Sequence, residues 1–217
     1  AGGIDIVKDD HGLANQPFAT FASRVELCAP AVREGAEIAG RPILYAPNVT
    51  APAGELIDRA RLAKDHGAGA LLVCPGLVGL DSMRALADDQ TIGLPILAHP
   101  AFLGSFVTSD DNGIGHAVIF GQLMRLAGAD ATIYPHAGGR FGFSQQQCRD
   151  IVRGCEVEMG ALKPIWPTPG GGMQLQRVPE LIEFYGPEVI FLVGGDLVAQ
   201  GPDIEANCRS FVGMVGG

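Results

Sequence analysis

The chain has 217 residues, of which 47% are hydrophobic and 18% are charged, and its formal net charge is −9 at pH 7. This composition supports a packed core, so it argues against a disordered protein, and the acidic balance argues against nucleic acid as a partner. No apolar run reaches the length of a membrane span and no charged-then-apolar leader precedes the first predicted strand, so we expect a cytoplasmic protein without a membrane partner.

Short apolar segments alternate with longer helical segments along the chain, which is typical of repeated βα units around a parallel sheet. The pattern predicts one α/β domain over residues 1–217. Each predicted strand ends in a polar loop or in a loop rich in glycine and proline. The seven predicted strands span Ile4–Val7, Pro42–Ala46, Ala70–Cys74, Pro95–Ala98, Thr132–Tyr134, Lys163–Trp166 and Val189–Val193.

Local signals predict helices between these strands. Ala53–His66 has apolar residues at helical spacing, Ser144 and Gln147 form a capping-box pattern, and Pro179–Glu180 indicates a further helix start. The cysteines have no metal-ligand spacing, so we expect free and mostly buried thiols. They are Cys28, Cys74, Cys148, Cys155 and Cys208.

The first predicted strand ends in four consecutive ionisable residues, Lys8, Asp9, Asp10 and His11. Ion pairing in a loop is the ordinary interpretation of such a cluster. Alternatively, a lysine that reacts with carbon dioxide becomes a carbamate, an anionic oxygen ligand that suits magnesium, and a nearby aspartate completes the site. His11 is then a metal ligand, a proton-transfer group or a spectator, and its nitrogen would suit manganese or zinc better than magnesium.

Other polar residues follow the ends of predicted strands, where barrel enzymes carry their catalytic groups. His99 comes directly after one strand and is a predicted catalytic residue, although a histidine buried in the core is a rival interpretation. Asn48 and Thr50 either line the pocket or only form a turn. His136 could contact substrate, whereas two further histidines are expected to be structural. These are His66 and His116.

Two glycine clusters predict an anion site, because glycine loops bring backbone N–H groups close to a ligand. They are Gly170-Gly171-Gly172 and Gly194-Gly195, and a tight turn is the alternative for either cluster alone. Arg140 follows Gly138-Gly139 and could hold a phosphate or carboxylate in a mobile loop. Trp166 is expected near the barrel mouth with a partner for its indole N–H.

The segment from Gly2 to Asp10 resembles the activation segment of the RuBisCO large-subunit superfamily, and Pro167–Gly172 and Phe191–Gly195 resemble its phosphate-binding segments. The resemblance covers essentially the whole chain. It implies an α/β fold of the (β/α)8 TIM-barrel type, in which the strand ending at Lys8 is the second. We therefore expect the first βα unit to be missing and the barrel domain to be incomplete at its amino terminus.

The resemblance also implies roles for individual residues. Lys8 would be carbamylated and would bind Mg2+, or Mn2+ or another divalent ion, together with Asp10 and His11. His99 matches an active-site histidine of the family, and Arg140 stands where the family has a lysine that closes over the substrate. The amino-terminal domain of a neighbouring subunit completes the family's site, which implies a homodimer or larger assembly.

Further departures, besides Arg140, separate the chain from carbon-fixing enzymes and indicate a RuBisCO-like protein of form IV. His11 replaces a glutamate ligand, Pro100 replaces an arginine that binds a second phosphate, and Asp196 replaces a glycine of the anion site. The family chemistry is stabilisation of an enolate by a metal. The absent second phosphate site therefore predicts a substrate with a single phosphate.

The predicted reaction is decarboxylation or C–C cleavage of a branched keto-sugar acid such as 3-oxo-isoapionate 4-phosphate, with a transcarboxylase/hydrolase as a variant. It rests on Pro100 and on Arg140, which could hold a carboxylate. One alternative is a methionine-salvage enolase or isomerase of a methylthio-ketose 1-phosphate, against which His11 counts. The other is a non-catalytic barrel that binds a sugar phosphate.

Overall fold

The computed structural model describes residues 2–109 and 111–216. Pairs between the named strands are parallel, as the predicted βα repeat requires. The strands are β1 (Ile6–Lys8), β2 (Leu44–Ala46), β3 (Leu71–Val73), β4 (Ile96–Ala98), β5 (Ala131–Pro135) and β6 (Trp166–Gly170). The α-helices are α1 (Phe21–Ala39), α2 (Ala53–Asp65), α3 (Pro75–Val78), α4 (Leu80–Asp88), α5 (Leu123–Leu126), α6 (Gln145–Glu156), α7 (Val178–Tyr185), α8 (Gly195–Ala199) and α9 (Ile204–Gly216). Short helices of other types are η1 (His11–Leu13), η2 (Leu103–Phe106), η3 (Val118–Gln122) and η4 (Leu175–Arg177).

The strands lie side by side in chain order. β1 pairs with β2, with Lys8 opposite Ala46, and β3 to β6 form a second ladder. Backbone hydrogen bonds from Leu72 N to Pro47 O (2.9 Å) and from Val49 N to Leu72 O (3.0 Å) join the two ladders. Because neighbouring strands are parallel, their carboxyl ends meet at one edge of the sheet.

β6 corrects the strand predicted at Lys163–Trp166, since it begins at Trp166 and continues to Gly170. Pro167 and Pro169 favour a loop in the sequence, but their backbones face away from β5. Trp166 N donates to Asp130 O (2.9 Å) and His136 N donates to Gly170 O (2.9 Å), so the alternate residues make the ladder with β5. Two prolines are therefore compatible with this strand.

The strand predicted at Val189–Val193 is wrong as a strand of the ladder, although this segment does run beside β6. Ile190 N donates to Pro167 O (3.0 Å) and Leu192 N donates to Pro169 O (3.1 Å). Proline has no N–H to donate in return. Half of the expected ladder is consequently absent between β6 and residues 190–192.

Sequence signals for the helices are confirmed. α2 ends at Asp65 and buries Leu56, Ala60 and Ala63. At the start of α6, Gln147 N donates to Ser144 Oγ (3.2 Å) and Ser144 N donates to the Gln147 side chain (2.8 Å), which completes the capping box. α7 begins at Val178, one residue before Pro179, so the proline lies in the first turn.

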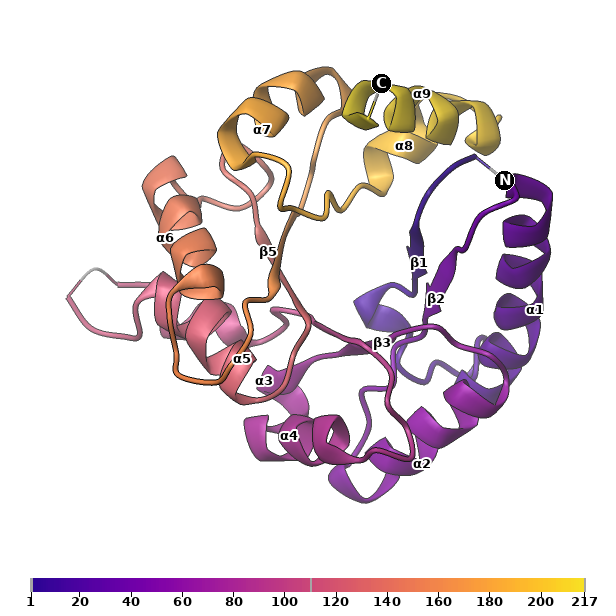
Figure 1. The fold of residues 1–217 in the computed structure, drawn as a ribbon, viewed down its shortest axis with the longest axis horizontal. Helices are drawn as coiled ribbons and strands as arrows, with labels where there is room; N and C mark the ends of the chain where they lie inside the picture. Colours follow the sequence, from indigo (N-terminus) through magenta and orange to yellow (C-terminus); the bar gives the residue numbers. More distant parts are fainter. Residues whose placement is uncertain (1, 110, 217) are drawn as a thin grey trace.

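Figure 1 shows the helices outside an arc of strands, with the amino-terminal segment near the carboxy-terminal helices α8 and α9. A cluster of small and aliphatic residues, the inner cluster, connects the strands. It contains Ala46, Ala70, Leu72, Leu97, Ala131 and Ile133, against which Ile6, Ile190 and Leu192 pack. Phe211 of α9 belongs to a third cluster against which Ile4 packs, so side chains connect the segment before β1 to the carboxy-terminal helices. An eight-stranded barrel that lacks one βα unit stays a prediction.

Candidate functional site

Residues from several strand ends meet at the carboxyl edge of the sheet. Lys8 ends β1, Cys74 follows β3, and His99 follows β4. The rings of His11 and His99 stack, with their centroids 4.5 Å apart and 17° between their planes. The structure thus brings together the first strand end and His99, which are about ninety positions apart in the chain.

Lys8 lies half-buried at this edge, where its Nζ donates a hydrogen bond to the backbone oxygen of Asp9 at 2.9 Å. Burial lowers the pKa of Lys8, although the negative charges of Asp10 and Asp9 oppose the shift. A lowered pKa increases the fraction of uncharged amine, which is the form that reacts with carbon dioxide.

Asp10 is exposed and its carboxylate is open to a ligand. It accepts a hydrogen bond from Gly12 N at 2.8 Å, and its Oδ2 lies 3.7 Å from His11 Nδ1. The pKa of Asp10 is lowered mainly by the Gly12 N–H and further by His11 and Lys8. Asp10 is therefore an ionised carboxylate beside both of its predicted partners.

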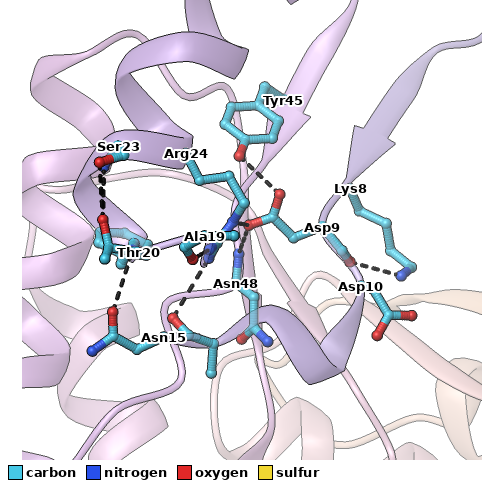
Figure 2. A network of polar contacts seen from close by, with 12 residues as sticks. Lys8, Asp9, Asp10, Asn15, Ala19, Thr20, Ser23, Arg24, Tyr45 and Asn48 are labelled. Atoms are coloured by element: carbon cyan, nitrogen blue, oxygen red, sulfur yellow. Dashed lines mark hydrogen bonds and ion pairs between the residues drawn. The ribbon is translucent and has the colours of Figure 1, made fainter. Parts of the chain in front are cut away.

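Asp9 has the opposite environment. It is buried and accepts hydrogen bonds from Arg24 Nε (2.6 Å), Tyr45 Oη (2.8 Å) and Asn48 N (3.0 Å). Figure 2 shows Asp9 directed toward Arg24 and Tyr45, while Lys8 and Asp10 lie on the other side of the strand end. This carboxylate is fully engaged within the protein.

His99 is held in one tautomer by the backbone. Ala101 N donates to His99 Nδ1 at 3.1 Å, so the proton of the neutral ring is on Nε2. Burial lowers the pKa of His99 to about 3, and the nearby His11 and Lys8 add to the effect. His99 can therefore act as an uncharged hydrogen-bond donor.

The donor set tests the predicted metal site. Among residues 2–109 and 111–216, no three His, Cys, Asp or Glu side chains are grouped so that they could hold a metal ion. Asp10 and His11 therefore need a third ligand. An amine cation repels a metal, so Lys8 fits this role only as its carbamate.

One residue at the site, Cys74, was not predicted from the sequence as a site residue. Cys74 is buried directly after β3, and its N–H donates to Thr50 Oγ1 at 2.9 Å. Burial raises the pKa of Cys74, while Thr50 and Lys8 oppose the shift. The sequence feature that could have identified Cys74 is its position at the end of a predicted strand. Asn48 serves the turn, because its side chain donates to His11 O at 2.9 Å and accepts from Thr50 N at 3.1 Å.

The loop after β5 carries Arg140 and His136. Arg140 N donates to Gly171 O at 2.8 Å, while its exposed guanidinium lies 5.7 Å from the ring centroid of Phe141. Arg140 has no ion-pair partner within the described part of the chain. His136 is buried, which lowers its pKa, and the adjacent backbone of Gly172 opposes that shift.

The two glycine clusters differ in their surroundings. Gly170 is the last residue of β6, and a Cβ there would lie 2.8 Å from Leu192 Cδ2. Gly171 and Gly172 have φ angles of 83° and 93°, and a Cβ on Gly172 would lie 2.7 Å from Arg140 Cγ. Backbone conformation and packing therefore explain this cluster without a ligand.

Gly194 and Gly195 have open space instead, since a Cβ on either would meet no atom within 4 Å. Their backbone can be approached by an anion. Asp196 does not occupy this space, because its Oδ2 accepts a hydrogen bond from Leu175 N at 2.8 Å.

The prediction for Trp166 is wrong. It begins β6, at the end of the strand opposite the candidate site, and its side chain is exposed. His66 and His116 have the structural contacts expected of them, since His66 Nδ1 lies 2.9 Å from Leu62 O and the ring of His116 packs edge-on against Phe143. The cysteines are free thiols, and all except half-buried Cys28 are buried.

Comparison with known proteins identifies the family. Residues 1–201 match the family model for the ribulose bisphosphate carboxylase large chain, catalytic domain. The chain belongs to this family. A RuBisCO-like protein 1 from Rhodopseudomonas palustris is 37% identical over 99% of the chain and 56% of the relative. The resemblance to RuBisCO-like proteins is therefore confirmed.

Other relatives of this RuBisCO-family chain have named activities. A 5-methylthioribulose-1-phosphate isomerase from Rhodospirillum rubrum is 38% identical over 100% of the chain and 56% of the relative. A 2,3-diketo-5-methylthiopentyl-1-phosphate enolase from Microcystis aeruginosa is 36% identical over 96% of the chain and 53% of the relative. The chain spans about half the length of the curated relatives it matches.

Solved structures show the same fold. The RuBisCO-like protein (MtnW) of Alicyclobacillus acidocaldarius has a TM-score of 0.90 at 36% identity, with 99% of this chain and 54% of that chain covered. The Rhodopseudomonas palustris RuBisCO-like protein has a TM-score of 0.88 at 37% identity, with 99% of this chain and 56% of that chain covered.

No helix in the described ranges is long and apolar enough to cross a membrane.

Proposed function

We propose that this chain is the catalytic barrel of a RuBisCO-like enzyme that forms an enolate from a methylthio-ketose 1-phosphate, as an isomerase or enolase of methionine salvage. The observation that carries the proposal is the meeting of Lys8, Asp10 and His11 with His99 at one edge of the sheet. Relatives at 36 to 38% identity carry isomerase and enolase names, which supports this substrate class.

This proposal ranks the methionine-salvage alternative above decarboxylation of a keto-sugar acid. Two of the three relatives compared above carry an isomerase or enolase name, the third is named only as a RuBisCO-like protein, and none of the three is named a decarboxylase. The site geometry is compatible with both reactions, because both require stabilisation of an enolate. His11 counts against an enolase only if a glutamate ligand is indispensable, and its position beside Asp10 supports a ligand role here.

Lys8, Asp10 and His11 would hold the divalent ion, which we propose to be Mg2+ or Mn2+. When bound, such an ion polarises a ketone and stabilises the negative charge of an enolate. The uncharged Lys8 amine attacks carbon dioxide: an N–C bond forms, the electrons of one C=O π bond move onto oxygen, and one proton passes from the nitrogen to solvent water. The product is a carbamate anion on Lys8.

The remaining residues bind and orient the substrate. His99 donates its Nε2 proton in a hydrogen bond to a substrate oxygen, since its Nδ1 is occupied by Ala101 N. The open backbone of Gly194 and Gly195 receives the phosphate, and Arg140 supplies a free guanidinium from the loop after β5. We further propose that the intact protein is a cytoplasmic homodimer.

The test is a substrate panel with the intact protein, Mg2+ and bicarbonate, followed by phosphorus and carbon NMR. The panel contains 5-methylthioribulose 1-phosphate, 2,3-diketo-5-methylthiopentyl 1-phosphate and 3-oxo-isoapionate 4-phosphate. We expect conversion of one of the two methylthio compounds, lost in Lys8→Ala and retained in Lys163→Ala, whose exposed lysine is remote from the site. Turnover of the oxo-acid alone would restore decarboxylation, and no turnover of any compound would favour a binding-only barrel.

A further inference from the structure

We propose that Asp9, Arg24 and Tyr45 form a clamp that positions Lys8 and Asp10 for carbamate formation and metal binding. The three are positioning residues, because the Asp9 carboxylate is turned toward Arg24 and Tyr45 and away from the proposed metal site. The inference rests on the proposed function for the roles of Lys8 and Asp10, and on the contacts of Asp9 for the clamp itself.

The clamp ties the strand end to two other elements. Arg24 comes from α1 and donates through Nε to Asp9 Oδ2 at 2.6 Å, while Tyr45 comes from β2 and donates to Asp9 Oδ1 at 2.8 Å. Both oxygens of the carboxylate are thus bound, and Asn48 N adds a third hydrogen bond at 3.0 Å. Figure 2 shows these contacts converging on Asp9 from one side.

Fixing Asp9 determines where its neighbours point. Side chains of consecutive residues in an extended strand alternate between opposite faces. Asp9 N also donates to Ala46 O at 3.1 Å, so the backbone is still paired with β2 at this position. With Asp9 held on the face of the strand that is turned toward α1, Lys8 and Asp10 are both directed to the opposite face, which Ile6 shares and where the predicted site lies.

The same network reaches the segment that follows the site. Arg24 Nη1 donates to Ala19 O at 2.8 Å, and Asn48 Nδ2 donates to His11 O at 2.9 Å. Asn48 therefore hydrogen-bonds to the residue before Asp10, which is Asp9, and to the residue after it, which is His11. A rotation of Asp9 would disturb all three predicted ligands together.

Stability alone is a weak reason for such an arrangement. Asp9 is 7% exposed, Arg24 is 8% exposed and Tyr45 is 2% exposed. An ion pair this deeply buried loses hydration that its mutual attraction only partly restores, and well-packed apolar residues often do as well. What the ion pair and its hydrogen bonds supply is a defined orientation, as the outer partners of metal ligands do.

The experiment measures the Lys8 carbamate by carbon-13 NMR in the intact protein, with labelled bicarbonate and a Mg2+ titration. Tyr45→Phe removes one hydrogen bond to Asp9, and Arg24→Lys keeps the charge but loses the planar donor group. We expect each variant to need roughly 10-fold more Mg2+ for half-maximal carbamate, the lower end of the range for partners that orient metal ligands. Arg125→Lys is the matched control, because Arg125 is equally buried but donates to backbone carbonyls such as Lys163 O and Leu162 O.

A merely structural clamp would lower the melting temperature in all three variants and leave the Mg2+ requirement unchanged, which would overturn the proposal. The proposal would also be overturned if the protein without any substitution formed no Lys8 carbamate. The proposed function can fail separately: a carbamate that Tyr45→Phe weakens, in a protein that converts no methylthio-ketose phosphate, supports the clamp and contradicts the substrate assignment.

Discussion

Asp9 and Asp10 are adjacent in the chain, but their carboxylates have different surroundings and therefore different expected roles. Asp9 is buried and bound by Arg24 and Tyr45, whereas Asp10 is exposed and, among the residues that the structure describes, contacts the N–H of Gly12 and the ring of His11. Removal of the same charge should therefore have different consequences at the two positions.

We predict that Asp9→Asn lowers the free energy of unfolding by about 3 to 5 kcal/mol, because it leaves the guanidinium of Arg24 buried without a counter-charge. Asp10→Asn should change it by less than about 0.5 kcal/mol, as surface substitutions usually do. Urea unfolding followed by circular dichroism measures both. Equal losses in the two variants would contradict the contrast drawn between them.

The buried cysteine Cys155 provides a prediction about pH. Burial raises its pKa from 9.0 to about 12, Glu156 adds to the shift and Arg125 opposes it. Since the folded thiol holds its proton more tightly than the unfolded one, its contribution to stability is complete below pH 9.0 and is lost as the pH rises toward 12. We expect iodoacetamide at pH 8 to modify half-buried Cys28 well before Cys155, as read by peptide mass spectrometry.

For single residues, the sequence predicts which side chains lie at the site, but it does not predict which residues hydrogen-bond to them. Lys8 and His99 could be found because each lies at a predicted strand end. The contacts of Asp9 could not, because Arg24 is 15 positions away and Tyr45 is 36 positions away, on elements whose facing sides only the fold determines.

At the scale of elements, the loops after β5 and β6 behave as one unit. Arg140 N donates to Gly171 O, and Gly172 leaves room for the side chain of Arg140. The sequence places the predicted strand too early, at Lys163–Trp166, because proline and glycine normally end a strand. A phosphate role for Gly170, Gly171 and Gly172 stays a prediction. Only the pairing of alternate residues with β5 shows that Pro167 and Pro169 are tolerated.

We predict that Gly172→Ala destabilises the fold by about 1 to 2 kcal/mol, since its φ of 93° is unfavourable for a residue with a Cβ, which would also press on Arg140. Gly195→Ala should change stability by less than about 0.5 kcal/mol, because it stands in open space in α8. Thermal unfolding of both variants tests this difference, and a similar loss in each would show that the glycines are equivalent.

The proposed phosphate site lies at Gly194 and Gly195, at the end of the segment that follows α7. Gly194→Asp places a negative charge where we expect the anion, so it should weaken binding of a methylthio-ketose phosphate by about 10-fold or more, equivalent to about 1.4 kcal/mol. Isothermal titration calorimetry measures the affinity, with Gly54→Asp, whose site in α2 also has open space, as the control. Unchanged affinity in Gly194→Asp would place the phosphate elsewhere.

At the scale of the whole molecule, six strands follow one another in chain order with helices between them, as the alternation of segments predicts, whereas the segment predicted as the seventh strand is not a strand. The inner cluster of small and aliphatic side chains, with helices outside, matches a βα barrel, and the ends of the described chain meet through Ile4 and the carboxy-terminal helices. The family match over residues 1–201 agrees with this architecture. Substrate and assembly do not follow from the fold, because one barrel supports many reactions.

We propose that Lys8, Asp10, His11 and His99, together with a divalent ion, promote formation of an enolate from the bound substrate. The most direct measurement is proton NMR of 5-methylthioribulose 1-phosphate in deuterium oxide with the intact protein, Mg2+ and bicarbonate. We expect the proton next to the ketone to exchange with solvent deuterium in the original protein and in Lys163→Ala, and this exchange to be lost in Lys8→Ala and on addition of EDTA. Exchange that persists in Lys8→Ala, or that does not depend on the metal, would contradict it.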